Sequence, residues 1–212
     1  MSLLVVLDAG HGGKDSGAIG NGLKEKDLTI KIVNRIADKL KMYDVRVAKT
    51  RVGDETLSLQ SRCNIANVLG ADLFVSVHIN AGGGTGYESF IHTSVKNDSE
   101  TIRLQKGFHN QTLFKDRGMK SSNFQVLRGT QMTAILTENG FIDNVNDMNV
   151  LTKNIEAVAD YHVYGILNYL GLKKKVNETY YIKTGTVNSI EVAEQVAKNI
   201  RKLGYLATIV KT

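Results

Sequence analysis

The stretch LDAGHGGKDSGAIGNGLKEKD (residues 7–27) contains six glycines, one histidine and, near its end, a glutamate between two lysines. It follows an apolar run at residues 3–8, which predicts a central strand buried on both faces. Glycine adopts backbone angles that other residues resist, and it allows close approach of another group to the backbone. We therefore interpret the stretch as a loop at the end of a strand, with His11 and Glu25 at its two edges.

Strand and helix patterns alternate along most of the remaining chain. Apolar runs or alternating patterns predict further strands at 44–48, 73–80, 87–93 and 134–142. Helical spacing of apolar residues predicts helices at 28–42, 57–69, 100–113 and 151–170. This order indicates an α/β fold, with a mostly parallel twisted sheet flanked by helices on both faces.

The character of the sequence changes after Gly171. We expect one domain at residues 1–171, a charged linker at 172–178 and a small β-α-β unit at 179–212. A unit this small usually needs help to fold, so it requires a partner. Residues 173–212 carry eight Lys and Arg against three Glu, which is most of the net charge of +6. Such a tail suits an anionic polymer, whether nucleic acid, a membrane surface or cell-wall glycan, or it is simply a solvated extension.

Cysteine and apolar content restrict the class of protein further. Cys63 is the only cysteine, which excludes an intramolecular disulfide, and its place on an apolar helix face predicts a core residue. No stretch reaches the roughly 18 apolar residues of a membrane helix. The N-terminal residues lack the features of a signal peptide, so we expect synthesis in the cytoplasm.

The predicted strands deliver chemically active side chains near their carboxyl ends. Asp8 ends the first strand and His11 follows it, His78 lies on the second apolar strand, and Glu138 lies on the third. Ligand sites of open α/β sheets lie outside these ends, and Glu25 can turn back toward the same edge. Two histidines and a carboxylate form a three-ligand zinc set, and a further carboxylate beside it can act as a base.

Other interpretations of the same residues stay open from spacing alone. A histidine at a strand end is commonly a hydrogen-bonded rim residue rather than a ligand. A phosphate-binding loop needs Ser or Thr after Gly-Lys, but here Asp15 follows Gly13 and Lys14. The other histidines lie outside ligand-like motifs, and we expect surface or capping roles for them: His92, His109 and His162.

Three motifs, DAGHGGKDSGAIGNGLKEKD, SVHIN and LTENGFIDN, occur in this order within residues 3–170. Together they closely resemble the zinc-dependent N-acetylmuramoyl-L-alanine amidases of the amidase-3 type, which include autolysins, sporulation amidases and phage endolysins. The resemblance implies Zn²⁺ held by His11, Glu25 and His78, with Glu138 as the catalytic glutamate. It also places Arg62 and Asn80 beside the site, as structural support first and as substrate contacts second.

The resemblance implies hydrolysis of the amide bond between N-acetylmuramic acid and the L-alanine of the peptidoglycan stem peptide. A zinc peptidase acting within the stem peptide and a non-catalytic cell-wall-binding protein are the alternatives. A nucleic-acid binder would account for the basic tail but leave the histidines without a role, so we expect no nucleic-acid partner.

The tail is similar to half of a SPOR-type peptidoglycan-binding module. Two chains could supply the missing halves to each other, so we expect a homodimer through the tail. Without export signals, we expect the protein to reach the cell wall only after release, by phage lysis or mother-cell lysis.

Overall fold

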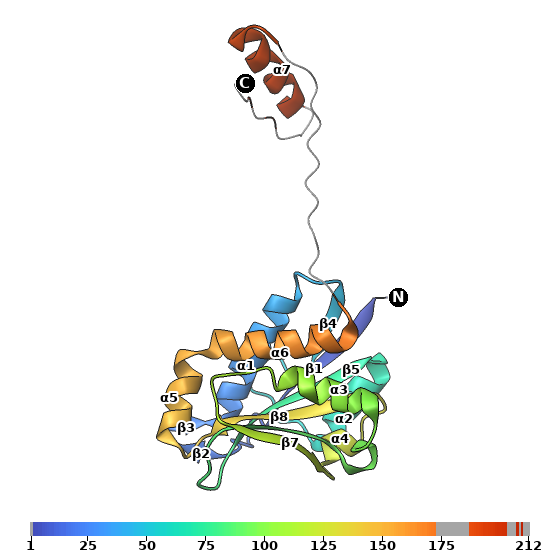
Figure 1. Cartoon of the computed structure of the whole chain (residues 1–212), viewed down its shortest axis with the longest axis vertical. Coiled ribbons are helices and arrows are strands. Elements are labelled where there is room, and N and C mark those ends of the chain that lie inside the picture. The colour runs from blue at the N-terminus through green and yellow to red at the C-terminus, as the bar shows by residue number, and fades with distance from the viewer. Residues whose placement is uncertain (1, 173–186, 203–206, 208, 210–212) are drawn as a thin grey trace. The chain divides into compact units, whose positions relative to one another are not determined.

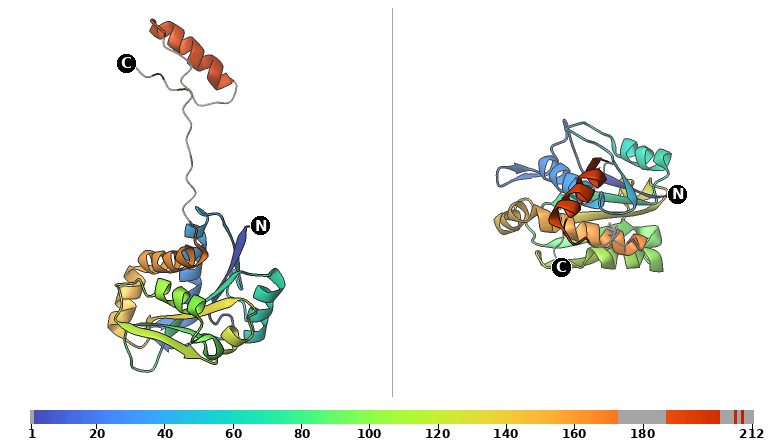
Figure 2. Two further views of the ribbon diagram at one scale, coloured as in Figure 1. Left: turned by 45° about the vertical axis from the view of Figure 1, so that its right-hand side comes forward. Right: turned by 90° about the horizontal axis from the view of Figure 1, so that it is seen from above.

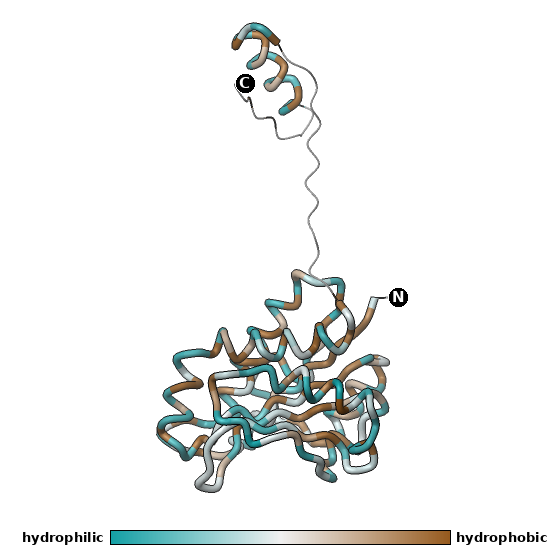
Figure 3. Tube along the Cα trace, in the orientation of Figure 1, coloured by the Kyte–Doolittle hydropathy of each residue, from teal (hydrophilic) through white to brown (hydrophobic). Residues whose placement is uncertain are grey.

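The computed structural model describes residues 2–172 and 187–202, together with positions 207 and 209. The chain divides into two compact units, Met1–Lys175 and Val176–Thr212. In the second unit, α7 (Ile190–Lys202) forms where the sequence predicts a helix, and hydrophobic and hydrophilic positions alternate along it (Figure 3). The linker and the two tail strands expected from the sequence lie outside the described residues, apart from positions 172, 207 and 209. Among the described helices, none has the length and apolar character needed to span a bilayer.

The first unit is built on a six-stranded sheet in the order β4-β1-β5-β8-β6-β7. Its strands, in sheet order, are β4 (Val45–Lys49), β1 (Leu3–Ala9), β5 (Leu73–Asn80), β8 (Thr133–Phe141), β6 (Tyr87–His92) and β7 (Asp116–Ser122). The first four are parallel, whereas β6 pairs antiparallel with β8 and parallel with β7. The predicted mostly parallel α/β fold is therefore confirmed, with two strands reversed at one edge. A small hairpin, β2 (Ile19–Gly20) and β3 (Leu23–Lys24), lies inside the glycine loop.

Helices cover both faces of this sheet (Figures 1 and 2). One face packs against α1 (Glu25–Leu40), α3 (Ser99–Phe108), α5 (Val145–Lys153) and α6 (Ile155–Leu170). The other face packs against α2 (Leu59–Leu69) and α4 (Gln125–Arg128). Successive side chains of a strand point to opposite faces, so Val5 and Leu7 join the first core, and Leu4 and Val6 join the second. Cys63 is fully buried in the second core, as predicted.

Local signals in the sequence set where most helices begin and end. Ser58 caps α2 by accepting a hydrogen bond from the Ser61 N–H, and Gly70 ends that helix with φ 61°. The prediction of one helix over 151–170 is wrong, because α5 ends at Lys153 and α6 begins at Ile155. Between them, Asn154 has non-helical backbone angles, and its side-chain amide donates to the Val150 carbonyl. Such a side-chain bond competes with the helical ladder.

Candidate metal centre

Three neighbouring strands bring polar side chains to one edge of the sheet. β1 leads into the loop that carries His11, while His78 on β5 and Glu138 on β8 are direct partners in the register of the two strands. Glu25 begins α1, and its backbone N–H donates to the Ala18 carbonyl at 3.0 Å. The loop therefore closes on the first turn of the helix, and this closure turns Glu25 back toward the strands.

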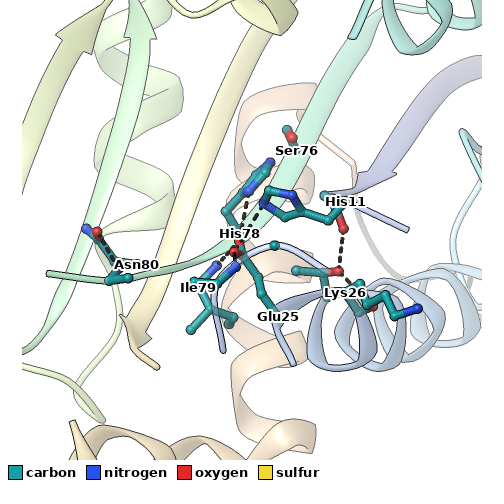
Figure 4. A network of polar contacts seen from close by, with 12 residues as sticks. His11, Glu25, Lys26, Ser76, His78, Ile79 and Asn80 are labelled. Atoms are coloured by element: carbon teal, nitrogen blue, oxygen red, sulfur yellow. Dashed lines mark hydrogen bonds and ion pairs between the residues drawn. The ribbon is translucent and has the colours of Figure 1, made fainter. Parts of the chain in front are cut away.

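His11, Glu25 and His78 form a compact cluster of metal-ligating atoms. His11 Nε2 lies 3.1 Å from Glu25 Oε2, and His78 Nδ1 lies 3.0 Å from Glu25 Oε1. The two imidazole rings meet edge to face, with centroids 5.0 Å apart. One ligand atom from each residue lies within 4.8 Å of the other two, and Figure 4 shows the three side chains turned toward one another. No other group of three such side chains with this spacing occurs among the described residues.

The charges within this cluster complement one another. Burial alone would raise the pKa of Glu25, but hydrogen bonds and charges from both imidazoles hold it well below its ordinary range. Burial alone would lower the pKa of His11, but Glu25 and Asp15 raise it to about 9. Glu25 likewise raises the pKa of His78 against the effect of burial. The backbone N–H of Ile79 also donates to Glu25 Oε1 at 3.0 Å, which fixes the carboxylate between the rings.

Glu138 lies beside this cluster with part of its carboxyl group unsatisfied. Its Oε2 is buried and has no hydrogen-bond partner in the described part of the chain. Burial is the main reason that its pKa is raised, to about 7. Burying an oxygen without a hydrogen-bond partner costs free energy. Oε2 of Glu138 is therefore available for a hydrogen bond that no side chain of the described residues makes.

A pocket of about 480 Å³ opens over these residues. His11, His78 and Glu138 contribute to one part of its lining, together with Asp8, Asp15 and Arg62. Apolar side chains form another part, namely Leu57, Leu59, Phe124, Val126 and Leu136. The two histidines of the cluster and Glu138 thus share one cavity with room for a substrate.

Comparison with known proteins agrees with this site. The family described as N-acetylmuramoyl-L-alanine amidase matches residues 5–168. The chain belongs to this amidase family. The endolysin of Bacillus phage SPP1 is 47% identical over 186 residues, which cover 82% of this chain and 69% of the endolysin. The sporulation-specific N-acetylmuramoyl-L-alanine amidase of Bacillus subtilis (strain 168) is 40% identical over 210 residues, which cover 95% of this chain and 82% of that protein.

Solved structures show the same fold. The catalytic domain of CwlV, an N-acetylmuramoyl-L-alanine amidase from Bacillus (Paenibacillus) polymyxa var. colistinus, superimposes with a TM-score of 0.75 at 34% identity. The match covers 81% of this chain and 99% of the CwlV domain. The shared part therefore corresponds to the first unit of this amidase.

Arg62 supports the strained backbone of the amidase loop. His11 has φ 62°, an unusual value for a residue other than glycine. The Arg62 guanidinium donates to Asp8 Oδ1 and to the Ala9 carbonyl, both at 2.7 Å, and to the His11 carbonyl at 2.6 Å. Strain of this kind persists only where neighbouring groups over-determine the conformation. Arg62 thereby links the end of β1 to the backbone of His11.

Arg51 is a second supporting arginine, which the sequence analysis did not identify. Its side chain is buried and donates to four backbone carbonyls, those of Ala9, Gly10, Lys26 and Gly53. These contacts join the loop before His11 to the first turn of α1, where Glu25 begins the helix. The only signal in the sequence is an arginine shortly after a predicted strand, which by itself indicates nothing about its partners.

Asn80 lies at the end of β5, apart from the three clustered side chains (Figure 4). Its amide nitrogen donates to Glu88 Oε1 at 2.8 Å, and its oxygen accepts from the Ala81 N–H at 2.8 Å. The side chain thus fixes the turn after β5 and connects it to β6.

The remaining histidines differ from one another in their surroundings. His92 is the N-cap of the short helix η1 (Thr93–Val95), and His109 is the C-cap of α3, so both occupy the capping positions expected of them. The expectation for His162 is wrong, because this side chain is buried. It donates through Nδ1 to the Val158 carbonyl at 2.8 Å, and its Nε2 lies 3.0 Å from Thr137 Oγ1. The apolar face of α6 carries it into the core.

Proposed function

We propose that this chain hydrolyses the amide bond between N-acetylmuramic acid and the L-alanine of the peptidoglycan stem peptide. The observation that carries the proposal is the clustering of His11, Glu25 and His78, whose two histidines line one pocket with Glu138 and its buried Oε2. Membership of the amidase family and the names of the relatives support the same bond. The glycan strand and its peptide are therefore the proposed substrate.

The donor set fits zinc. Two imidazole nitrogens and one carboxylate are a common protein ligand set for catalytic zinc, with a further position left for water or substrate. His11, Glu25 and His78 would hold the ion, since their ligand atoms already lie within 4.8 Å of one another. When bound, Zn²⁺ polarises a carbonyl oxygen and lowers the pKa of a water molecule.

Glu138 is the proposed general base and acid. It takes a proton from the water that attacks the carbonyl carbon, and it delivers that proton to the amide nitrogen as the carbon–nitrogen bond breaks. Its unpartnered Oε2 and its pKa of about 7 suit both halves of this transfer. In this proposal Arg62 and Asn80 have supporting roles, because their polar groups are engaged with the backbone and with neighbouring carboxylates.

The assignment of Glu138 is tested with Glu138→Gln, which keeps the size of the side chain and removes its basicity. We expect unchanged zinc content and melting temperature, with turnover on purified cell walls reduced at least about 100-fold. Glu156→Gln on the exposed surface of α6 is the matched control, and it should keep wild-type turnover. Normal lysis by Glu138→Gln would refute the assigned role, and full lysis after exhaustive chelation would refute the role of zinc.

The products of a wall digest distinguish the proposed activity from its alternatives. An amidase releases peptides that begin with L-alanine and leaves the sugar chains intact, which mass spectrometry detects directly. A peptidase would leave L-alanine attached to the sugar, and a non-catalytic wall-binding protein would release nothing.

For the second part of the chain, we propose a linker at 172–178 and a wall-binding or dimerising segment at 179–212. The net charge of this region suits an anionic wall polymer, and α7 is an amphipathic helix with Val192 and Val196 exposed. The proposed place of action is the cell wall after release from the cell that makes the protein. Light scattering of the full chain at micromolar concentration tests dimerisation, and a monomer there would refute it.

A further inference from the structure

Two cationic side chains lie beyond Glu138 in the sheet, on the side away from His11 and His78. Glu88 on β6 is the direct cross-strand partner of Glu138 on β8. Glu88 Oε2 accepts hydrogen bonds from Arg117 Nε at 2.6 Å and from Lys120 Nζ at 2.5 Å. Both cations come from β7, the strand that follows β6 in the sheet.

The group formed by Glu88 and its two cationic partners has more positive than negative charge. Arg117 and Lys120 share one carboxylate, which leaves a single positive charge in excess. The Glu88 side chain is 5% exposed, whereas those of Arg117 and Lys120 are 33% and 38% exposed. The carboxylate is therefore enclosed, and the cations remain open to solvent. The excess charge is available to an anion arriving from outside.

Packing holds both cations in place. The Arg117 guanidinium lies over the Phe141 ring, 4.8 Å from its centroid, and Lys120 Nζ lies 5.8 Å from the centroid of Phe90. Phe90 in turn meets Phe124 edge to face, and Phe124 lines the pocket over the metal centre. Cations fixed in this way lose less side-chain entropy when they bind an anion. Lys120 is thus connected to the pocket wall through the rings of Phe90 and Phe124.

The distance from the catalytic carboxyl group matches the length of a short peptide. Neighbouring strands are about 4.8 Å apart, and the cations lie one hydrogen bond beyond Glu88, so they are on the order of 7 Å from Glu138. Two extended residues span about 7 Å. In the substrate, the carboxyl group of muramic acid is already part of the amide to be cleaved, so further carboxylates belong to the peptide.

We propose that Arg117 and Lys120 form a subsite for a free carboxylate of the stem peptide, on the residue that follows L-alanine. This inference rests on the amidase activity proposed above. The proposed subsite places the peptide, and with it the leaving amine, on the side of the pocket toward β6 and β7. The glycan then lies toward the other end of the pocket. A substrate whose carboxylate is replaced by a neutral amide loses this contact.

The test uses two synthetic substrates, N-acetylmuramoyl-L-alanyl-D-glutamine, whose α-carboxylate is free, and its α-amide, which has no free carboxylate on the peptide, so that the two differ by one charge. We expect the wild-type protein to favour the acid about tenfold in kcat/KM, mainly through KM, because the interaction is one charge-assisted contact. Lys120→Gln should remove most of this preference, and its fold should survive because Arg117 and Asn80 still bond Glu88. Lys106→Gln, at an exposed lysine on α3, should keep the preference.

Failure of the amidase proposal and failure of the subsite proposal give different experimental results. Cleavage of neither substrate nor of cell walls by the wild-type protein would refute the proposed amidase activity. Cleavage of both at equal kcat/KM, or a preference that Lys120→Gln and Arg117→Lys both retain, would refute the subsite alone. Inhibition by the dipeptides L-alanyl-D-glutamine and L-alanyl-D-glutamine α-amide, of which only the first has a free carboxylate, gives a readout without turnover. Equal inhibition by the two would also overturn the subsite.

Discussion

Replacing Arg62 by methionine tests whether this arginine supports the candidate metal centre or contacts the substrate. The side chains of Arg62 and Asp8 are 3% and 0% exposed, and their closest atoms are 2.7 Å apart. In Arg62→Met the apolar part of the side chain remains, but Asp8 stays buried with hydrogen bonds only from the Ser76 and Thr50 hydroxyl groups. Removing one partner of a buried ion pair costs about 3–5 kcal/mol, because the other charge is left uncompensated.

This cost predicts a large change in melting temperature. A domain of this size loses about 2–4 °C for each kcal/mol, so Arg62→Met should melt roughly 6–20 °C below the wild-type protein. The pH dependence has a definite sign. Arg62 and hydroxyl groups hold the pKa of Asp8 below its ordinary value, although burial alone would raise it. The stability from this pair is therefore present above the unfolded pKa of about 3.9 and is lost as the pH falls through the lower folded value.

Thermal unfolding at pH 7 and at pH 3, followed by circular dichroism, measures both effects. The double variant Asp8→Asn/Arg62→Met should be less destabilised than the sum of its single variants, because the buried charge has been removed as well. Turnover measured well below the melting temperature gives the second readout. If Arg62→Met melts like the wild-type protein but cleaves no cell wall, Arg62 contacts substrate and the supporting role is wrong.

Three further substitutions test other parts of the first unit. Gly17 has φ 62°, and a Cβ there would lie 2.6 Å from the His11 ring. Gly17→Ala should weaken zinc binding by about 10–100-fold in a chelator competition, whereas Gly22→Ala, at φ 73° with open space around it, should not. Arg51→Lys cannot reach all four carbonyls and should lower the free energy of unfolding in urea by about 3 kcal/mol. Burial lowers the pKa of His162 to about 4 from its ordinary 6.5, so stability should rise by about 3 kcal/mol from pH 4 to pH 6.5, and His162→Gln should flatten this rise.

The central fold was predictable because its strands are buried on both faces. Such strands have mainly apolar sequences, as at Leu3–Ala9 and Leu73–Asn80, and these stand out without any knowledge of their neighbours. Parallel strands then end at the same edge, so the approach of His78 to Glu138 follows from topology. The strand β7 was missed for the converse reason. Its sequence DRGMKSS is polar and partly exposed, as in many edge strands, and has no apolar pattern.

The supporting contacts of the site were not predictable, because they depend on side chains meeting across long stretches of chain. Three of the four carbonyls that Arg51 bonds lie 25 to 42 residues away, and no local pattern specifies such partners. The lack of a hydrogen-bond partner for Glu138 Oε2 and the raised pKa of this residue both result from burial, which is a property of the folded chain. The cations around Glu88 share this dependence, since both come from the strand that the sequence did not reveal.

The glycines of the loop have a more specific role than flexibility. A Cβ at Gly10 would lie 2.3 Å from His78 Cε1, and a Cβ at Gly17 would lie 2.6 Å from His11 Cδ2 and 2.7 Å from Glu25 Oε2. All three clustered side chains therefore pack directly against glycine backbone. A side chain at either position would force the donor atoms apart, since real Cβ atoms do not tolerate such distances. Glycine at positions 10 and 17 is thus a steric requirement of bringing two imidazoles and one carboxylate to a single point.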